Sequence, residues 1–291
     1  MRRPGVLRKG DEIAVVAPSS PFDRTRFERG VQALGQLGLT PVFTERVFEK
    51  QAFLAGSDGD RQNELQRALD GPAKAIILAR GGYGALRFAT TLRQIPAKPL
   101  IGYSDATVLH EVWWRARVPS IHGPMCTQLG EDPSALERLG ALLLTSQPAA
   151  PIEWKPEQSA GRAEGVLRGG NLATLASLCG TPLQPGFKDA LVLLEDLNEP
   201  PYRLDRLLTQ LLLSGAFDGV RGFVIGDLVA PGEPQEGRAE AVAERLGSLR
   251  VPVAFGAPFG HAGRNQPVAF GAAHALDAGR GLLVPLEPLT C

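Results

Sequence analysis

The stretch LIGYSDATVLHEVWWRAR, residues 100–117, contains one complete strand-to-helix unit. Its first residues, Leu100 to Tyr103, form a short apolar run typical of a buried strand. From Asp105 to Arg117, apolar residues recur at positions 109, 112, 113 and 116, which is the spacing of one buried helix face. The stretch therefore predicts a β-strand, a tight turn at Ser104 and a helix.

Units of the same kind lie on both sides of this stretch. Expected strands are 12–17, 40–43, 75–79, 100–103 and 120–124. Expected helices are 27–37, 61–69, 105–117 and 134–144, with a further one starting near Ala85. Strands that alternate with helices are typical of βαβ units, so we predict an α/β fold with a mostly parallel sheet.

The pattern dissolves between Ser146 and Gly165 into proline, glycine and polar residues. We expect an N-terminal domain at 1–147, a linker at 148–164 and a C-terminal domain at 165–291. In the last of these, strands are expected at 190–194, 222–225, 251–255 and 268–270, and helices at 171–178, 203–213 and 239–246. This predicts a second, smaller α/β domain.

Composition excludes several classes of function. The 291 residues include 31 Lys plus Arg and 31 Asp plus Glu, and no basic stripe, so a nucleic-acid partner is not expected. The apolar stretch at 13–18 is too short for a membrane span or a secretory signal, so we expect a cytoplasmic protein without a membrane partner. Cys126, Cys179 and Cys291 form no CxxC pair, which argues against disulfides and a structural zinc site.

The turn between strand and helix is a candidate nucleophile site. Gly102 to Ala106 places a serine between small residues, close to the G-x-S-x-G nucleophile elbow but with alanine in the last position. The helix start behind it offers free amides, and Asp105 would supply an N–H for an oxyanion. An ordinary N-cap explains Ser104 equally well when the turn is considered alone.

A second candidate is Arg80-Gly81-Gly82-Tyr83-Gly84, directly after the apolar strand that ends at residue 79. Glycines let the backbone approach a ligand closely, and Arg80 could hold a carboxylate. The spacing does not match the G-x-G-x-x-G dinucleotide fingerprint. The structural alternative is a plain turn with a surface arginine.

The second half holds two further candidates. Glu195 ends an apolar strand, where a carboxylate can orient a histidine, although a solvated acidic turn is the simpler explanation. His261 is one of four histidines and lies in the glycine-rich loop 258–265, which can present a base without burying it. The other three histidines, at positions 110, 122 and 274, are expected to pack or to lie near a turn.

Together these segments resemble the LD-carboxypeptidase family of serine peptidases, which also contains microcin C immunity proteins. The resemblance runs through nearly the whole chain in ordered motifs. They are 17–20, 80–84, 102–105, 122–125, 169–172, 180–182, 195–196, 200–206 and 258–265.

The resemblance implies a Rossmann-like parallel-sheet N-terminal domain, a smaller C-terminal domain that encloses a barrel-like sheet, and a homodimer. It implies Ser104 as nucleophile, Glu195 as the acid of the triad and His261 as general base, meeting at the inter-domain cleft. No cofactor and no metal are expected. The implied reaction releases D-alanine from a murein tetrapeptide through an acyl-enzyme, in cytoplasmic cell-wall recycling.

Binding residues follow from the same resemblance. The amides of Asp105 and of Gly81 or Gly82 would form the oxyanion hole. Arg80, or the loop that contains Gly170 and Asn171, would grip the peptide.

Three alternatives remain open. An immunity-type peptidase acting on aminoacyl-nucleotide mimics would need an aromatic platform for the base, and the sequence offers no clear one. A Rossmann-type nucleotide-dependent oxidoreductase fits the topology but lacks the fingerprint. A two-domain solute-binding protein would use the cleft without chemistry.

Overall fold

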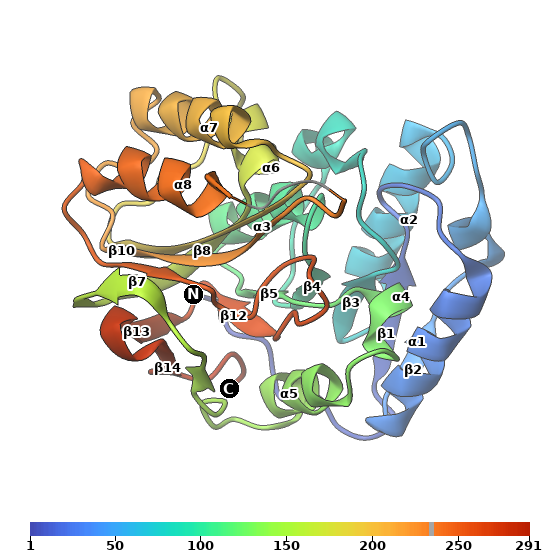
Figure 1. Ribbon diagram of the computed structural model, residues 1–291. Coiled ribbons are helices and arrows are strands. Elements are labelled where there is room, and N and C mark those ends of the chain that lie inside the picture. The colour runs from blue at the N-terminus through green and yellow to red at the C-terminus, as the bar shows by residue number, and fades with distance from the viewer. Residues whose placement is uncertain (233–235) are drawn as a thin grey trace. The chain divides into compact units, whose positions relative to one another are not determined.

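A computed structural model of the protein describes residues 1–232 and 236–291, and the chain forms two compact units (Figure 1). Unit 1 contains Met1–Ala149, Gln266–Gly271 and Pro288–Cys291. Unit 2 contains Ala150–Asn265 and Ala272–Glu287. Short segments from the end of the chain therefore complete the N-terminal unit.

Unit 1 is built on a six-stranded sheet with the order β12-β5-β4-β3-β1-β2. Its strands are β1 (Glu12–Val16), β2 (Thr40–Val42), β3 (Ala75–Leu78), β4 (Leu100–Gly102), β5 (Ser120–His122) and β12 (Val268–Phe270). The first five pair in parallel. The central strands are buried apolar runs, as expected for a parallel sheet covered on both faces. The predicted α/β class with a mostly parallel first sheet is confirmed.

Strand β12 differs from the sequence-based expectation. The run 268–270 was expected in the C-terminal domain, but it pairs antiparallel with β5 at the edge of the unit 1 sheet. The edge of β5 would otherwise present unpaired N–H and C=O groups, which a returning strand satisfies. Local sequence shows that residues 268–270 are extended but not which edge they cover.

Helices α1 (Arg24–Gln36), α2 (Asp58–Asp70) and α3 (Ala106–Arg115) of unit 1 connect its parallel strands, and α4 (Cys126–Leu129) and α5 (Pro133–Leu144) follow the last of them, β5. Short 3₁₀ turns occupy Glu45–Phe48, Ala85–Arg87 and Ala89–Thr91. The prediction of a helix that starts near Ala85 is therefore wrong. Phe88 leaves helical geometry at φ −135°, and its ring packs against the buried guanidinium of Arg61.

Unit 2 contains a mixed eight-stranded sheet with the order β6-β14-β13-β8-β9-β10-β11-β7. Its strands are β6 (Ile152–Glu153), β7 (Glu157–Ala160), β8 (Arg162–Asn171), β9 (Ala190–Leu197), β10 (Gly222–Val229), β11 (Val253–Phe255), β13 (Ala273–Asp277) and β14 (Leu282–Pro285). Strands β8 to β11 pair in parallel, and the others pair antiparallel. The stretch 148–164, expected as a linker, carries β6, β7 and the start of β8. A further 3₁₀ turn spans Ala278–Arg280.

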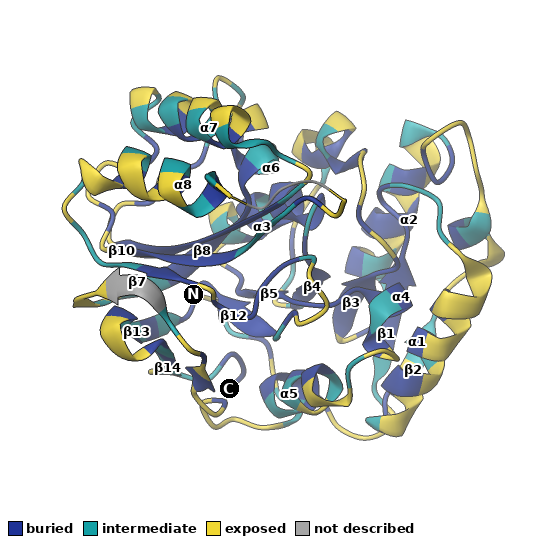
Figure 2. Ribbon diagram, in the orientation of Figure 1, coloured by how far each residue is buried: buried dark blue, intermediate teal, exposed yellow. Residues whose placement is uncertain are grey.

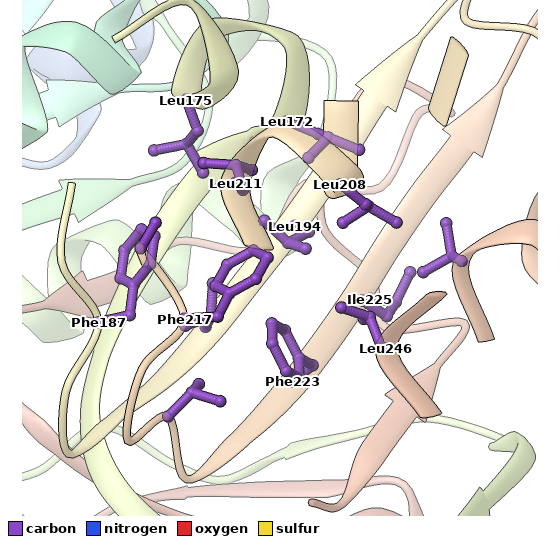
Figure 3. Close-up of a cluster of buried hydrophobic side chains, with 14 of the residues drawn as sticks. Leu172, Leu175, Phe187, Leu194, Leu208, Leu211, Phe217, Phe223, Ile225 and Leu246 are labelled. Carbon is purple, nitrogen blue, oxygen red and sulfur yellow. The ribbon is translucent and has the colours of Figure 1, made fainter. Parts of the chain in front are cut away.

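Helices α6 (Leu172–Ser177), α7 (Pro201–Leu213) and α8 (Arg238–Gly247) pack on this sheet (Figure 3). Their apolar faces meet β9 and β10 in a buried cluster that includes Leu175, Leu208, Leu246, Leu194 and Phe223. The outward faces of α7 and α8 are exposed (Figure 2). The core thus holds β9 and β10 rigidly, and both strands lead to the candidate site.

Across the two described ranges, no helix combines the length and the apolar character needed to span a bilayer.

Candidate functional site

Ser104 occupies a strained turn between β4 and α3. Its φ is +62°, a left-handed conformation that a residue other than glycine adopts rarely. The residues two positions before and after Ser104 are small for a reason: a Cβ on Gly102 would lie 3.0 Å from the Cβ of Ala106. The N-cap of α3 is Asp105 and not Ser104, so the capping explanation for this serine does not hold. The geometry is that of a nucleophile elbow.

The backbone of Gly81 lies against the Ser104 side chain. A Cβ built on Gly81 would lie 3.3 Å from Ser104 Oγ, so the Gly81 backbone directly adjoins the hydroxyl. Within the described residues, the amides of Gly81, Gly82 and Asp105 donate no hydrogen bond. Such amides can receive negative charge that develops on a substrate oxygen.

The carboxylate of Asp105 connects the turn to its neighbours. Ser19 Oγ donates to Asp105 Oδ2 at 2.6 Å, and the Ala85 amide donates to the same oxygen at 2.9 Å. Burial raises the pKa of Asp105, while these hydrogen bonds and the charge of Arg61 oppose the rise. Three segments of unit 1 are therefore fixed around Ser104.

Arg80 is exposed and follows β3. Its Nη1 donates to the carbonyl oxygen of Pro21 at 2.6 Å, which directs the side chain along the loop after β1. Its predicted role as a peptide-binding residue stays a prediction.

Glu195 and His261 form a dyad in unit 2. His261 Nδ1 lies 2.7 Å from Glu195 Oε2, and the carboxylate is completely buried at the end of β9. Because the carboxylate accepts the Nδ1 proton, the neutral ring carries its lone pair on Nε2. The structure thus brings together two of the three predicted triad residues, and Ser104 lies in unit 1.

The electrostatic environment favours the charged form of the histidine. Burial alone would lower the pKa of His261, but the hydrogen bond to Glu195 and the charges of Glu195, Asp196 and Asp227 outweigh it. The net pKa of His261 is raised above its ordinary value. A base of this kind is neutral, and therefore active, only in the neutral to alkaline range.

Two carboxylates in this environment were not singled out from the sequence. Asp196 follows Glu195 directly, and Asp227 lies in β10, the strand beside β9. A usable signal was present, because Asp227 follows the buried apolar run 222–225 and so lies near the carboxyl end of a parallel strand.

Gly170 and Asn171, predicted to bind the peptide, end β8. Asn171 Oδ1 accepts from the Thr174 amide at 3.0 Å and caps α6, and its Nδ2 donates to Asp196 Oδ1 at 3.2 Å. Gly170 has a φ of +135°, which favours glycine at this position. The Asn171 side chain therefore holds local structure, and its binding role stays a prediction.

The other histidines are buried, as predicted for His110 and His122. Gly102 O can only accept, so His110 Nε2–H donates to it at 3.0 Å, while Nδ1 faces Ser120 Oγ at 2.8 Å. Burial lowers the pKa of His110 to about 4. His110 is therefore a structural residue beneath the Ser104 turn. In the part of the chain that the structure describes, no three His, Cys, Asp or Glu side chains gather as a metal site would require.

Comparison with known families gives matches over both units. Residues 13–123 match the model of the LD-carboxypeptidase N-terminal domain, and residues 164–276 match that of the LD-carboxypeptidase C-terminal domain.

Individual relatives cover the same range. A Streptomyces coelicolor protein to which carboxypeptidase activity is ascribed is 40% identical over 99% of this chain and 97% of its own. The murein tetrapeptide carboxypeptidase of Pseudomonas aeruginosa is 32% identical over 92% of this chain and 94% of its own. Among solved structures, a MccF-like protein from Bacillus anthracis has a TM-score of 0.86 and 25% identity, covering 98% of this chain and 99% of its own. MccF itself is the microcin C7 self-immunity protein.

Proposed function

Because this chain belongs to the LD-carboxypeptidase family of peptidases, we propose that it is a serine carboxypeptidase that releases the terminal D-alanine of murein tetrapeptides. The observation that carries the proposal is the pairing of two features. Ser104 is held at φ +62° against the backbone of Gly81, whose amide donates no hydrogen bond within the described residues, and His261 is fixed by the buried carboxylate of Glu195. Membership of a peptidase family also disfavours the oxidoreductase and solute-binding alternatives.

The reaction begins with proton transfer. Nε2 of neutral His261 takes the proton of the Ser104 hydroxyl as Oγ attacks the carbonyl carbon of the L-centre residue, diaminopimelate or lysine. This step requires Ser104 Oγ and His261 Nε2 to come within about 3 Å of each other. Glu195 holds the Nδ1 proton and stabilises the imidazolium that forms.

The tetrahedral intermediate then collapses. Its oxyanion accepts hydrogen bonds from the amide of Asp105 and that of Gly81 or Gly82. The imidazolium gives its proton to the leaving nitrogen, which releases D-alanine and leaves an ester on Ser104. Water, deprotonated by His261, hydrolyses that ester and restores the enzyme.

The remaining parts of the proposal concern binding and context. We assign the grip on the peptide to Arg80, or to the segment with Gly170 and Asn171. We further propose that the protein acts as a homodimer in cytoplasmic recycling of murein peptides. The name of the Pseudomonas aeruginosa relative supports the murein substrate.

The decisive assay measures D-alanine released from a murein tetrapeptide by purified protein. Ser104→Ala and His261→Ala should each lower kcat by about 10³-fold or more, because the three groups act as a unit. Ser248→Ala, which removes an exposed hydroxyl at the end of α8, should keep wild-type activity. Activity should survive a chelator. Turnover by the Ser104→Ala protein would exclude this mechanism, and so would loss of wild-type activity on chelation.

One observation favours the immunity-type alternative. Phe53 and Tyr83 are 59% and 49% exposed, and their ring centroids lie 5.9 Å apart. Tyr83 directly follows Gly82, and Phe53 lies in the loop before α2. Exposed rings can stack on a nucleobase. The second candidate is therefore hydrolysis of aminoacyl-nucleotide mimics by the same three residues. Two results together would favour this candidate. Wild-type protein would turn over such a mimic faster than the tetrapeptide, and Tyr83→Ala would lower turnover of the mimic but not of the tetrapeptide.

A further inference from the structure

Asp227 lies at an irregularity in the sheet beside Glu195. Strand β10 pairs with β9 through Ile225 opposite Leu194 and Leu228 opposite Asp196. Between these pairs β10 has two residues, Gly226 and Asp227, where β9 has only Glu195. One extra residue in a strand forms a bulge, which redirects the local side chains.

Backbone and side chain of Asp227 hold both sides of the histidine segment. The Asp227 amide donates to the carbonyl oxygen of Phe259 at 2.8 Å. The amide of Ala262 donates to Asp227 Oδ2 at 2.6 Å. Since Phe259 and Ala262 lie on either side of Gly260 and His261, residue 227 fixes the segment that presents the imidazole.

Two glycines permit this close approach. A Cβ on Gly226 would lie 2.3 Å from the carbonyl oxygen of Phe259. A Cβ on Gly260 would lie 2.9 Å from Asp227 Cβ and 3.2 Å from Glu195 Cβ, and Gly260 has a φ of +122°. The segment that contains His261 can therefore pack on β9 and β10 only because Gly226 and Gly260 have no side chain.

Three carboxylates near the histidine segment also act on His261 electrostatically. Glu195, Asp196 and Asp227 all raise the pKa of His261 against the effect of burial. Burial raises the pKa of Asp227 itself, the Ala262 amide lowers it, and Glu195 raises it further. The positive charges of His261 and Arg264 also lower the pKa of Asp227. These groups are the charged neighbours that act on Asp227 and His261.

We infer that Asp227 is a positioning residue for His261: its carboxylate anchors the segment that presents the imidazole through the amide of Ala262, and its backbone amide anchors the same segment through Phe259. The inference rests on the proposed function, in which His261 is the general base. A carboxylate serves here better than a neutral acceptor, because it combines a strong hydrogen bond from the amide with a stabilising charge near the imidazolium.

Two substitutions separate these effects. Asp227→Asn keeps an oxygen that accepts from the Ala262 amide but removes the charge. Asp227→Ala removes both. Asp218→Asn is the matched control, because it deletes an exposed carboxylate elsewhere in unit 2.

The pKa of His261 is measured by NMR, and kcat and KM are measured against pH. In Asp227→Asn, the NMR pKa and the acid limb of kcat/KM should both fall by about half a pH unit or more, with the alkaline kcat within about 3-fold of wild type. In Asp227→Ala, kcat should fall about 10-fold or more with little change in KM, because misplacement of a base affects the transition state. The control should match wild type in all three readouts.

An unchanged His261 pKa in Asp227→Asn, or an unchanged kcat in Asp227→Ala, would overturn the inference. Should Asp227→Ala fail to fold, the Asp227→Asn titration decides alone. The NMR arm does not depend on turnover and is repeated in a Ser104→Ala background. If wild-type protein released no D-alanine, the proposed function would fail, while the titration would still test the link between Asp227 and His261.

Discussion

Gly81 lies directly against the side chain of Ser104, so that a Cβ added to Gly81 would stand 3.1 Å from Ser104 Cβ and 3.3 Å from its Oγ. The backbone at Gly81 has no positive φ, so alanine is tolerated there by the main chain. Its effect would come from contact with the serine, and a third contact, 3.4 Å from Met125 Cε, limits relaxation on the other side.

We therefore expect Gly81→Ala to lower kcat for D-alanine release by about 10-fold or more, because a small displacement of a nucleophile or an oxyanion donor is costly. Thermal stability should change little. Gly35→Ala, in α1 with no atom within 4 Å of the added Cβ, is the control and should keep wild-type kcat. Equal kcat in the two variants would remove Gly81 from the proposed oxyanion hole.

The strain at Ser104 leads to a stability prediction. A residue with a Cβ in the left-handed region costs about 1 kcal/mol or more relative to glycine. Ser104→Gly should therefore have a free energy of unfolding about 1 kcal/mol higher than Ser104→Ala, while neither variant turns over substrate. Urea unfolding monitored by circular dichroism measures the difference. Equal unfolding free energies would mean that the turn relaxes in solution.

Two histidines should titrate on opposite sides of the ordinary value near 6.5. Burial lowers the pKa of His110 to about 4, whereas Glu195 and the neighbouring carboxylates raise that of His261. An NMR titration should show one imidazole that stays neutral down to about pH 5 and one that becomes charged above 6.5. The acid limb of kcat/KM should follow the titration of His261 and should show no step at the pKa of His110.

The sign for stability is opposite for these two rings. His110 contributes stability that is lost as the pH falls from 6.5 towards 4, because the unfolded ring binds the proton first. His261 contributes stability that is lost as the pH rises from 6.5 through its raised pKa. Identical titration of both rings would contradict the assignment of His261 as the partner of a buried carboxylate.

The sequence allowed the parallel sheet of unit 1 to be predicted because each strand is a short apolar run followed by a helical pattern. Leu100–Gly102 and the helix after it appear almost as expected. The partner of β12 was missed, since three extended residues at 268–270 carry no information about which sheet edge they cover. The strands within 148–164 were missed for a similar reason, because their pairing is long-range and their composition is polar.

The candidate site could be predicted in part. Glu195 and His261 were selected from residue chemistry and from a family resemblance, and the structure places them 2.7 Å apart. Asp227 was missed because its role depends on a bulge, and a bulge is defined by the register of two strands that are distant in sequence. Asn171 was expected to bind peptide, yet the structure uses its side chain to cap α6 and to bind Asp196.

Asp196 leads to a prediction about pH. Burial and the adjacent Glu195 charge raise its pKa to about 7, although the amides of Ala173 and Leu197 and the side chain of Asn171 favour the ionised form. An acid whose pKa is higher in the folded state binds more protons there than in the unfolded chain. The contribution of Asp196 to the free energy of unfolding should therefore fall as the pH rises from about 4 to about 7 and level off above.

Asp196→Asn should remove this contribution, because the amide does not ionise, so its free energy of unfolding should change with a more positive slope against pH than that of the wild type. Urea unfolding at several values between pH 4 and pH 6 measures the slope in both proteins, where His261 is largely protonated and the contribution of His110 is shared by the two and cancels in the comparison. The comparison uses slopes because the amide of asparagine would face donors that the carboxylate accepts, which changes the absolute stability as well. Parallel pH dependence in the two proteins would show that Asp196 is ionised throughout this range, and that its hydrogen bonds from Asn171, Ala173 and Leu197 offset the effects of burial and of Glu195.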